Sequence, residues 1–128
     1  MPRGNTVPKI LLCLTIAFQA RAQSAPAIFS GGIVSAASYA APPLAPGSIA
    51  AAFGNFLLPA PLIAPAGALP TNLAGLSLEL NTQPAPLFYA SGFEVNFQVP
   101  WELAGNAQVS VAAALNGQTG PSQTLTLA

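Results

Sequence analysis

The sequence lacks most of the side chains that enzymes use for catalysis. Of its 128 residues none is histidine and only one is cysteine, while three are Lys or Arg and three are Asp or Glu. Arg3, Lys9 and Arg21 all fall within the first 22 residues, so the chain from Gln23 onward has no Lys, Arg, His, Asp or Cys. Ser-His-Asp triads, Cys-His pairs, Schiff-base lysines and HExxH zinc sites are therefore excluded from that part of the chain.

The missing charges also exclude classes of partner. Only Glu79, Glu94 and Glu102 are charged after residue 22, which gives this part a formal charge of −3. Cationic side chains hold nucleic acids and anionic lipid surfaces, so neither is expected to bind here. Without cysteine no disulfide framework forms, and stability must come from apolar burial and backbone pairing.

The first 22 residues have the pattern of an export signal. Arg3 and Lys9 precede a short apolar segment from Ile10 to Phe18, and Ala20-Arg21-Ala22 fits the small-x-small pattern that signal peptidase cuts behind. The apolar segment has about half of the ~20 residues that a membrane-spanning helix needs. Cys13 lies inside this segment rather than after it, which argues against a lipoprotein. We predict that residues 1–22 are removed, that no transmembrane segment remains, and that the protein is secreted, periplasmic or on the cell surface.

The remaining 128 − 22 = 106 residues are enough for one small domain. We predict a flexible tail over residues 23–31 and an antiparallel β-sandwich over residues 32–128. Apolar and polar residues alternate in four segments: 76–80, 93–99, 109–115 and 124–127. Shorter strands are expected over 32–35, 48–53 and 86–90, and Asn116-Gly117 is a hairpin-turn sequence. A period of two with closely spaced turns predicts an all-β fold of two sheets.

The segment from Phe56 to Pro70 is apolar and uncharged, but its four prolines exclude a continuous helix. We predict an extended loop on a sheet edge. Its large side chains either form an exposed patch for a partner domain or fold back over the edge. These side chains are Phe56, Leu57, Leu58, Leu62 and Ile63.

Four motifs follow one another along the chain: SAASYAAPPLAPGSIAAAFGNFL (35–57), LPTNLAGLSLELN (69–81), APLFYAS (85–91) and VNFQVPWEL (95–103). In this order they resemble an uncharacterised domain of secreted acidobacterial proteins, which is itself similar to IPT/TIG immunoglobulin-like modules. The resemblance covers about Gly32 to Leu127. It implies an immunoglobulin-like (IPT/TIG-like) β-sandwich, an extracellular or envelope location, and no enzymatic activity or catalytic residues. The chain departs from the family at Gly92-Phe93-Glu94-Val95, where members commonly have a Pro-Gly-Gln-Ile turn. Many members also continue into a second similar module, whereas this sequence stops at Ala128.

The main functional prediction is a secreted, non-catalytic structural or interaction module of the cell envelope or extracellular space. It would take a protein or polysaccharide partner and would need no cofactor and no metal. Scattered glutamates without an Asp-rich loop do not predict a calcium site. In this interpretation Trp101 caps the end of the core and Tyr89 lines it, because large aromatic side chains are usually buried in small β domains. Phe88, Phe93 and Phe97 are expected in the core.

Two other functions remain open. A carbohydrate-binding module would stack sugars on Trp101 and Tyr89, while Asn96 and Gln98 hydrogen-bond hydroxyl groups. That function requires an exposed indole. A carboxylate-dependent glycoside hydrolase would use Glu94 and Glu102 as acid and base or nucleophile, which requires their carboxyl groups to lie about 5–10 Å apart.

Overall fold

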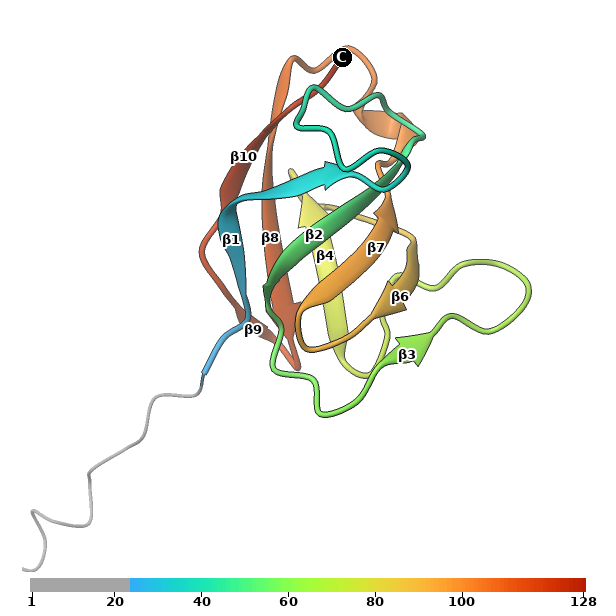
Figure 1. Cartoon of the computed structure of the whole chain (residues 1–128), viewed down its shortest axis with the longest axis vertical. Helices are drawn as coiled ribbons and strands as arrows, with labels where there is room; N and C mark the ends of the chain where they lie inside the picture. The colour runs from blue at the N-terminus through green and yellow to red at the C-terminus, as the bar shows by residue number, and fades with distance from the viewer. Residues whose placement is uncertain (1–23) are drawn as a thin grey trace, which may run out of the picture.

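A computed structural model describes residues 24–128, so the predicted signal peptide lies outside the described residues. The described part is built from β-strands and one short 3₁₀ helix (Figure 1). In chain order these are β1 (Ala27–Ser35), β2 (Ile49–Asn55), β3 (Leu62–Ile63), β4 (Leu76–Leu80), β5 (Gln83–Pro84), β6 (Leu87–Ala90), β7 (Glu94–Gln98), η1 (Trp101–Leu103), β8 (Gln108–Leu115), β9 (Gln118–Thr119) and β10 (Gln123–Thr126). Within residues 24–128 there is no helix of the length and apolarity that crossing a membrane requires.

The strands form two sheets that pack face to face. The first sheet has the order β1-β2-β7-β6-β3 and the second β10-β8-β4-β5, with β9 paired to β8, and every strand pair is antiparallel. This confirms the predicted all-β fold of two antiparallel sheets. Alternate residues of each strand point between the sheets, as in the burial pattern of β4, where Leu76, Leu78 and Leu80 are fully buried.

The strands of the second half lie close to their predicted positions because their turns are encoded locally. Asn116 and Gly117 have φ angles of 50° and 86°, as a tight hairpin between β8 and β9 requires. Asn81 and Thr82 have φ angles of 56° and 83° between β4 and β5. Positive φ at two consecutive residues reverses the chain with the twist that antiparallel strands need, so these short turns fix the register.

The first strand begins at Ala27, five residues before the predicted start at Gly32, so only part of the predicted tail lies outside a strand. Its pairing with β2 is interrupted between Ile28 and Ile33, where Gly31 has a φ angle of 71°. Such a bulge adds unpaired residues to one strand of a pair. The Gly31-Gly32 pair therefore interrupts the strand here and does not mark its beginning.

Close backbone contact holds the start of β1 against the second sheet. The carbonyl oxygen of Pro26 lies where a Cβ atom on Gly120 would be placed, and the Gln123 side-chain amide donates a hydrogen bond of 3.2 Å to the Ile28 carbonyl. The first strand therefore contacts both sheets, which closes the sandwich along this side.

Substituting Gly120→Ala is expected to displace the beginning of β1 and to destabilise the protein by about 1–3 kcal/mol, as overpacking does. Hydrogen exchange at the amides of Ala27 to Phe29 should accelerate more than exchange in β4, which rises only with the loss of global stability. Ser122→Ala is the control, because Ser122 is exposed and lies two residues further along the same connection. Unchanged exchange in β1 would contradict the close-contact explanation.

The edges of both sheets are protected from pairing with other chains by means other than lysine side chains, which often have this role. Two edge strands, β3 and β5, are two residues long and adjoin or carry a proline, namely Pro61 before β3 and Pro84 in β5. On the other two edges β1 is bulged, and β10 accepts a hydrogen bond from the Leu44 amide at the Thr126 carbonyl. Short, bulged or proline-flanked edges resist pairing with another chain. The edges of both sheets therefore offer little free backbone for pairing with another chain.

Candidate binding face

The outer faces of the two sheets differ strongly in character. The second sheet exposes Ser, Thr, Ala, Gln and Glu side chains, such as Glu79, Ser110 and Thr124. Every exposed large apolar side chain in residues 24–128 lies on a strand of the first sheet or in a segment that begins at one of its strands. These residues are Phe29, Tyr39, Ile49, Leu57, Leu62, Ile63, Phe93 and Trp101.

The register defines which side chains share the outer face of the first sheet. Ala50 and Ala52 pair with Phe97 and Val95 and belong to the core, so the residues between them point outward. One outward row crosses all five strands, and a second row lies toward the end of β7. The first row is Val34, Ala51, Asn96, Tyr89 and Ile63, and the second is Ile49 and Gln98. We call these two rows, together with Trp101, the outer face.

The expectation that Trp101 plugs the core is wrong. Its side chain is 66% exposed, in η1 just beyond the end of β7. A Cβ atom on Gly47 would lie about equally close to Cζ2, Cε2 and Cη2 of the indole. An atom equally near three consecutive ring atoms stands over the ring rather than beside its edge. One face of the indole therefore rests on the Gly47 backbone.

The support under the indole is fixed by several hydrogen bonds. The Gly47 amide donates to the Val99 carbonyl at 2.7 Å, and the Gln98 side-chain amide donates to the Gly47 carbonyl at 3.1 Å. Gly47 has a φ angle of 86°, which only glycine adopts without strain. Pro100 and Leu103, which flank Trp101 in the chain, are buried and anchor η1. Trp101 and its support are thus held in place by the fold itself.

Tyr89 and Asn96 are directly opposite each other on β6 and β7, and both are half-buried on the outer face. Tyr89 therefore does not line the core as predicted. The Asn96 Oδ1 atom is buried and has no hydrogen-bond partner among the described residues. A buried carbonyl oxygen without a partner costs about 1–3 kcal/mol.

The four residues proposed for carbohydrate contact thus lie together on one surface. Asn96 and Gln98 are two residues apart on the same side of β7, about 7 Å along the strand. Gln98 contacts the support of Trp101, and Tyr89 adjoins Asn96. Beside Ile49 lies a shallow groove of about 350 Å³, lined by Ser35, Ala36, Ala37, Ser48 and Ile49.

Glu94 and Glu102 are not brought together. Glu94 is the first residue of β7, and Glu102 lies in η1 beyond the last. The strand alone spans about 13 Å, which exceeds the separation of about 5–10 Å found in glycosidase pairs. Within the described part of the chain no three His, Cys, Asp or Glu residues are grouped as metal ligands would be.

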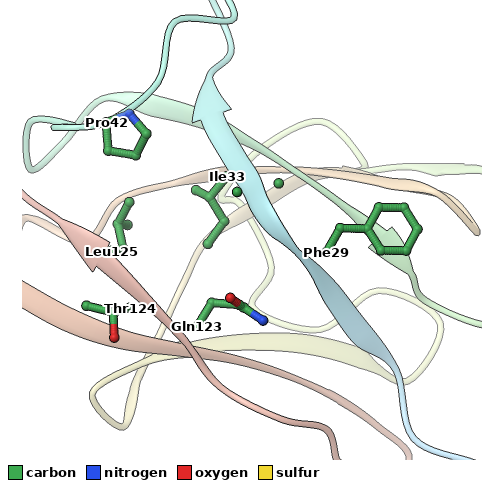
Figure 2. Close-up of a pocket in the computed structure, with 8 residues that line it drawn as sticks. Phe29, Ile33, Pro42, Gln123, Thr124 and Leu125 are labelled. Carbon is green, nitrogen blue, oxygen red and sulfur yellow. The ribbon is translucent and has the colours of Figure 1, made fainter.

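A second cavity lies between the bulge of β1 and β10 (Figure 2). It has a volume of about 60 Å³, and Ile33 and Leu125 line it along with Gln123. In Figure 2 the Phe29 ring lies on the opposite side of the β1 ribbon from Gln123. The cavity has no ionisable lining residue and is far smaller than the ~300–1,000 Å³ of ligand pockets. It is a packing gap left by the bulge.

The loop after β2 is partly folded back onto the core and partly exposed, so each of the two predicted alternatives holds for some of its side chains. Phe56 is fully buried and Leu58 packs against the core, whereas Leu62 and Ile63 are exposed on β3 at the sheet edge. Ile63 is 75% exposed and extends the outward row that contains Tyr89. Sequence reasoning missed this connection, because only the pairing of β3 with β6 places Ile63 on the outer face.

No protein-family model, no curated protein and no solved structure matches this chain. Function must therefore be argued from the two-sheet fold and from the outer face itself.

Proposed function

We propose that this protein is a secreted, non-catalytic interaction module with an immunoglobulin-like sandwich fold. Strand order supports the fold assignment. When β3 and β9 are set aside, the other strands take the letters A, B, C, C′, D, E, F and G along the chain. The sheets then read A-B-E-D and G-F-C-C′. Immunoglobulin domains place A, B, E and D in one sheet and C, F and G in the other.

The asymmetry of exposed apolar residues carries the functional proposal. A fold that needed only solubility would have no reason to expose all its large apolar side chains on and around one sheet. Exposed apolar patches mark interaction sites, and Trp and Tyr are enriched among the residues that contribute most to binding. The first sheet therefore presents the binding surface, and the polar second sheet faces solvent.

The carboxylate geometry supports a non-catalytic role. The three glutamates are the only acidic side chains, and β7 separates Glu94 from Glu102. The resemblance to the acidobacterial secreted domain, with its IPT/TIG-like relatives, agrees with an interaction module in the envelope or outside the cell. A protein or a polysaccharide is the proposed partner.

Paired substitutions on the two sheets test the choice of surface. The exported protein is immobilised, and material that it retains from the native secreted fraction is compared among variants. We expect Ile49→Asp with Ile63→Asp to reduce retention at least tenfold, because both exposed side chains lie on the outer face. The control is Ser110→Asp with Thr124→Asp on the second sheet, which adds the same charge. Equal retention by the two double variants would reject the first sheet as the binding surface.

Carbohydrate binding is the second candidate function, and one observation favours it. The Trp101 indole is exposed and supported from one side, which is the condition this function requires. Tyr89, Asn96 and Gln98 lie on the same outer face. Amphipathic aromatic rings beside amide groups suit a ligand that has both apolar faces and hydroxyl groups.

A further inference from the structure

The indole of Trp101 is a flat surface with one covered face and one free face. Gly47 covers the ring from below, and the side chain as a whole is 66% exposed. A ligand that stacks on the free face therefore does not need to displace a protein side chain. Because Gly47 is fixed by Val99 and Gln98, little conformational entropy is lost when the ligand stacks.

The polar groups near this surface are neutral. Gln98 and Ser48 adjoin Gly47, and Asn96 is two residues further along β7. Amides and hydroxyls both donate and accept hydrogen bonds, which suits ligand hydroxyl groups. No cation lies anywhere in residues 24–128, and Glu102 is next to Trp101 in the chain. An anionic ligand would find no counter-charge here and would be repelled by Glu102.

The surroundings favour a glycan over a peptide. Peptide anchors need pockets that enclose a side chain, and proline-rich peptides need aromatic-lined grooves. Around Trp101 the structure offers the small residues Gly47 and Ser48, and the adjoining groove beside Ile49 is shallow and lined mainly by Ala and Ser. An open, flat and uncharged surface fits the face of a sugar ring.

From these observations we infer that Trp101, resting on Gly47 and flanked by Gln98, forms a stacking site for uncharged, hydroxyl-rich glycans. This inference rests on the carbohydrate-binding function proposed above and adds the chemical class of the ligand. Trp101 contacts the sugar, and Gly47 is a positioning residue that keeps the indole in place. Gln98 holds the Gly47 carbonyl and presents its amide oxygen to the ligand.

Affinity electrophoresis of the exported protein tests the inference. The gels contain neutral polysaccharides (dextran, galactomannan or hydroxyethyl cellulose) or anionic ones (alginate or polygalacturonate). We expect retardation by at least one neutral polysaccharide and by neither anionic one. Tryptophan fluorescence should shift to the blue when the neutral ligand binds. Affinity should change less than twofold when NaCl rises from about 50 to about 500 mM, because no ion pair contributes.

Four variants locate the site. Trp101→Ala should weaken binding at least tenfold, and Trp101→Tyr should restore part of it. Gly47→Ala should weaken binding and red-shift the free protein's fluorescence, because its Cβ would displace the indole. Phe93→Ala is the matched control. Phe93 is also an exposed aromatic residue, but it precedes the first residue of β7, whereas Trp101 follows the last, so its loss should not affect binding. Circular dichroism confirms that each variant keeps its β-sheet spectrum.

Each failure has a separate meaning. Binding to anionic polysaccharides, or strong weakening by salt, would overturn the ligand class and leave carbohydrate binding in place. Unchanged binding by Trp101→Ala would overturn the site. No binding to any polysaccharide would overturn both this inference and the carbohydrate function. The proposal of an interaction module would then depend on the retention experiment with the Ile49→Asp, Ile63→Asp double variant alone. A Trp101-dependent fluorescence shift with a proline-rich peptide in place of every glycan would overturn the ligand class in favour of a protein partner.

Discussion

Replacing Phe97 with alanine lowers the free energy of unfolding by about 3–5 kcal/mol, the range for removing a buried aromatic side chain. Phe97 is fully buried, and its neighbours across the sheet are Ala50 on β2 and Leu87 on β6. Because Ala50 is small, it cannot fill the cavity that loss of the Phe97 ring leaves. Small domains are stable by about 5–15 kcal/mol, so the variant should be close to unfolding. Urea denaturation followed by circular dichroism measures the change.

Phe93→Ala is the matched control for this measurement. It removes the same side chain four residues earlier in the chain, but Phe93 is 75% exposed. Surface substitutions usually change stability by less than about 0.5 kcal/mol. Similar losses for the two variants would contradict the placement of Phe93 outside the core.

The contrast between these two phenylalanines shows what a period of two can and cannot predict. Alternation over residues 93–99 correctly predicts that Val95, Phe97 and Val99 face the core. It fails at Phe93, because the turn before β7 extends further than the pattern indicates. The Ser91 hydroxyl accepts hydrogen bonds from the amides of Phe93 and Glu94, at 3.2 and 3.0 Å. Alternation does not reveal where such a turn ends. Phe88 was also predicted to be core, but it is only half-buried at a bulge in the pairing of β6 with β7.

The start of β1 was missed for a related reason. Gly31-Gly32 reads as a boundary, since glycine weakens strands and often marks a turn. In the structure the strand continues on both sides of these residues because Ile28 and Ile33 both bury their side chains. Tertiary packing decides this case, and the local sequence holds no sign of it.

The candidate site was predictable in its members but not in its arrangement. Asn96 and Gln98 alternate with buried residues, so their outward direction follows from the sequence. The position of Trp101 depends on Gly47, which is distant in the chain and is placed under the indole by the pairing of β2 with β7. No local pattern relates these two residues. The general tendency of large aromatic side chains to be buried therefore predicts the wrong position for Trp101, which is exposed.

Replacing Phe56 with alanine should also destabilise the protein by about 3–5 kcal/mol. Phe56 is fully buried at the end of β2, and its amide donates to the Gly92 carbonyl at 2.9 Å. Together with Leu58 and Leu73 it attaches the long connection from β2 to β4 to the core, so its loss should loosen that connection first.

Ile63→Ala is the control, because Ile63 lies in the same connection and is 75% exposed. It should cost no more than about 1 kcal/mol, since little apolar surface is removed from contact with the protein. Limited chymotrypsin digestion gives the second measurement. Cleavage within residues 57–75 should accelerate in Phe56→Ala before the sandwich as a whole unfolds, because the connection opens locally at lower free energy than the core. If both variants unfold at the same urea concentration as the wild type, Phe56 does not anchor the connection, which is then held by Leu58, Leu73 and the pairing of β3 with β6.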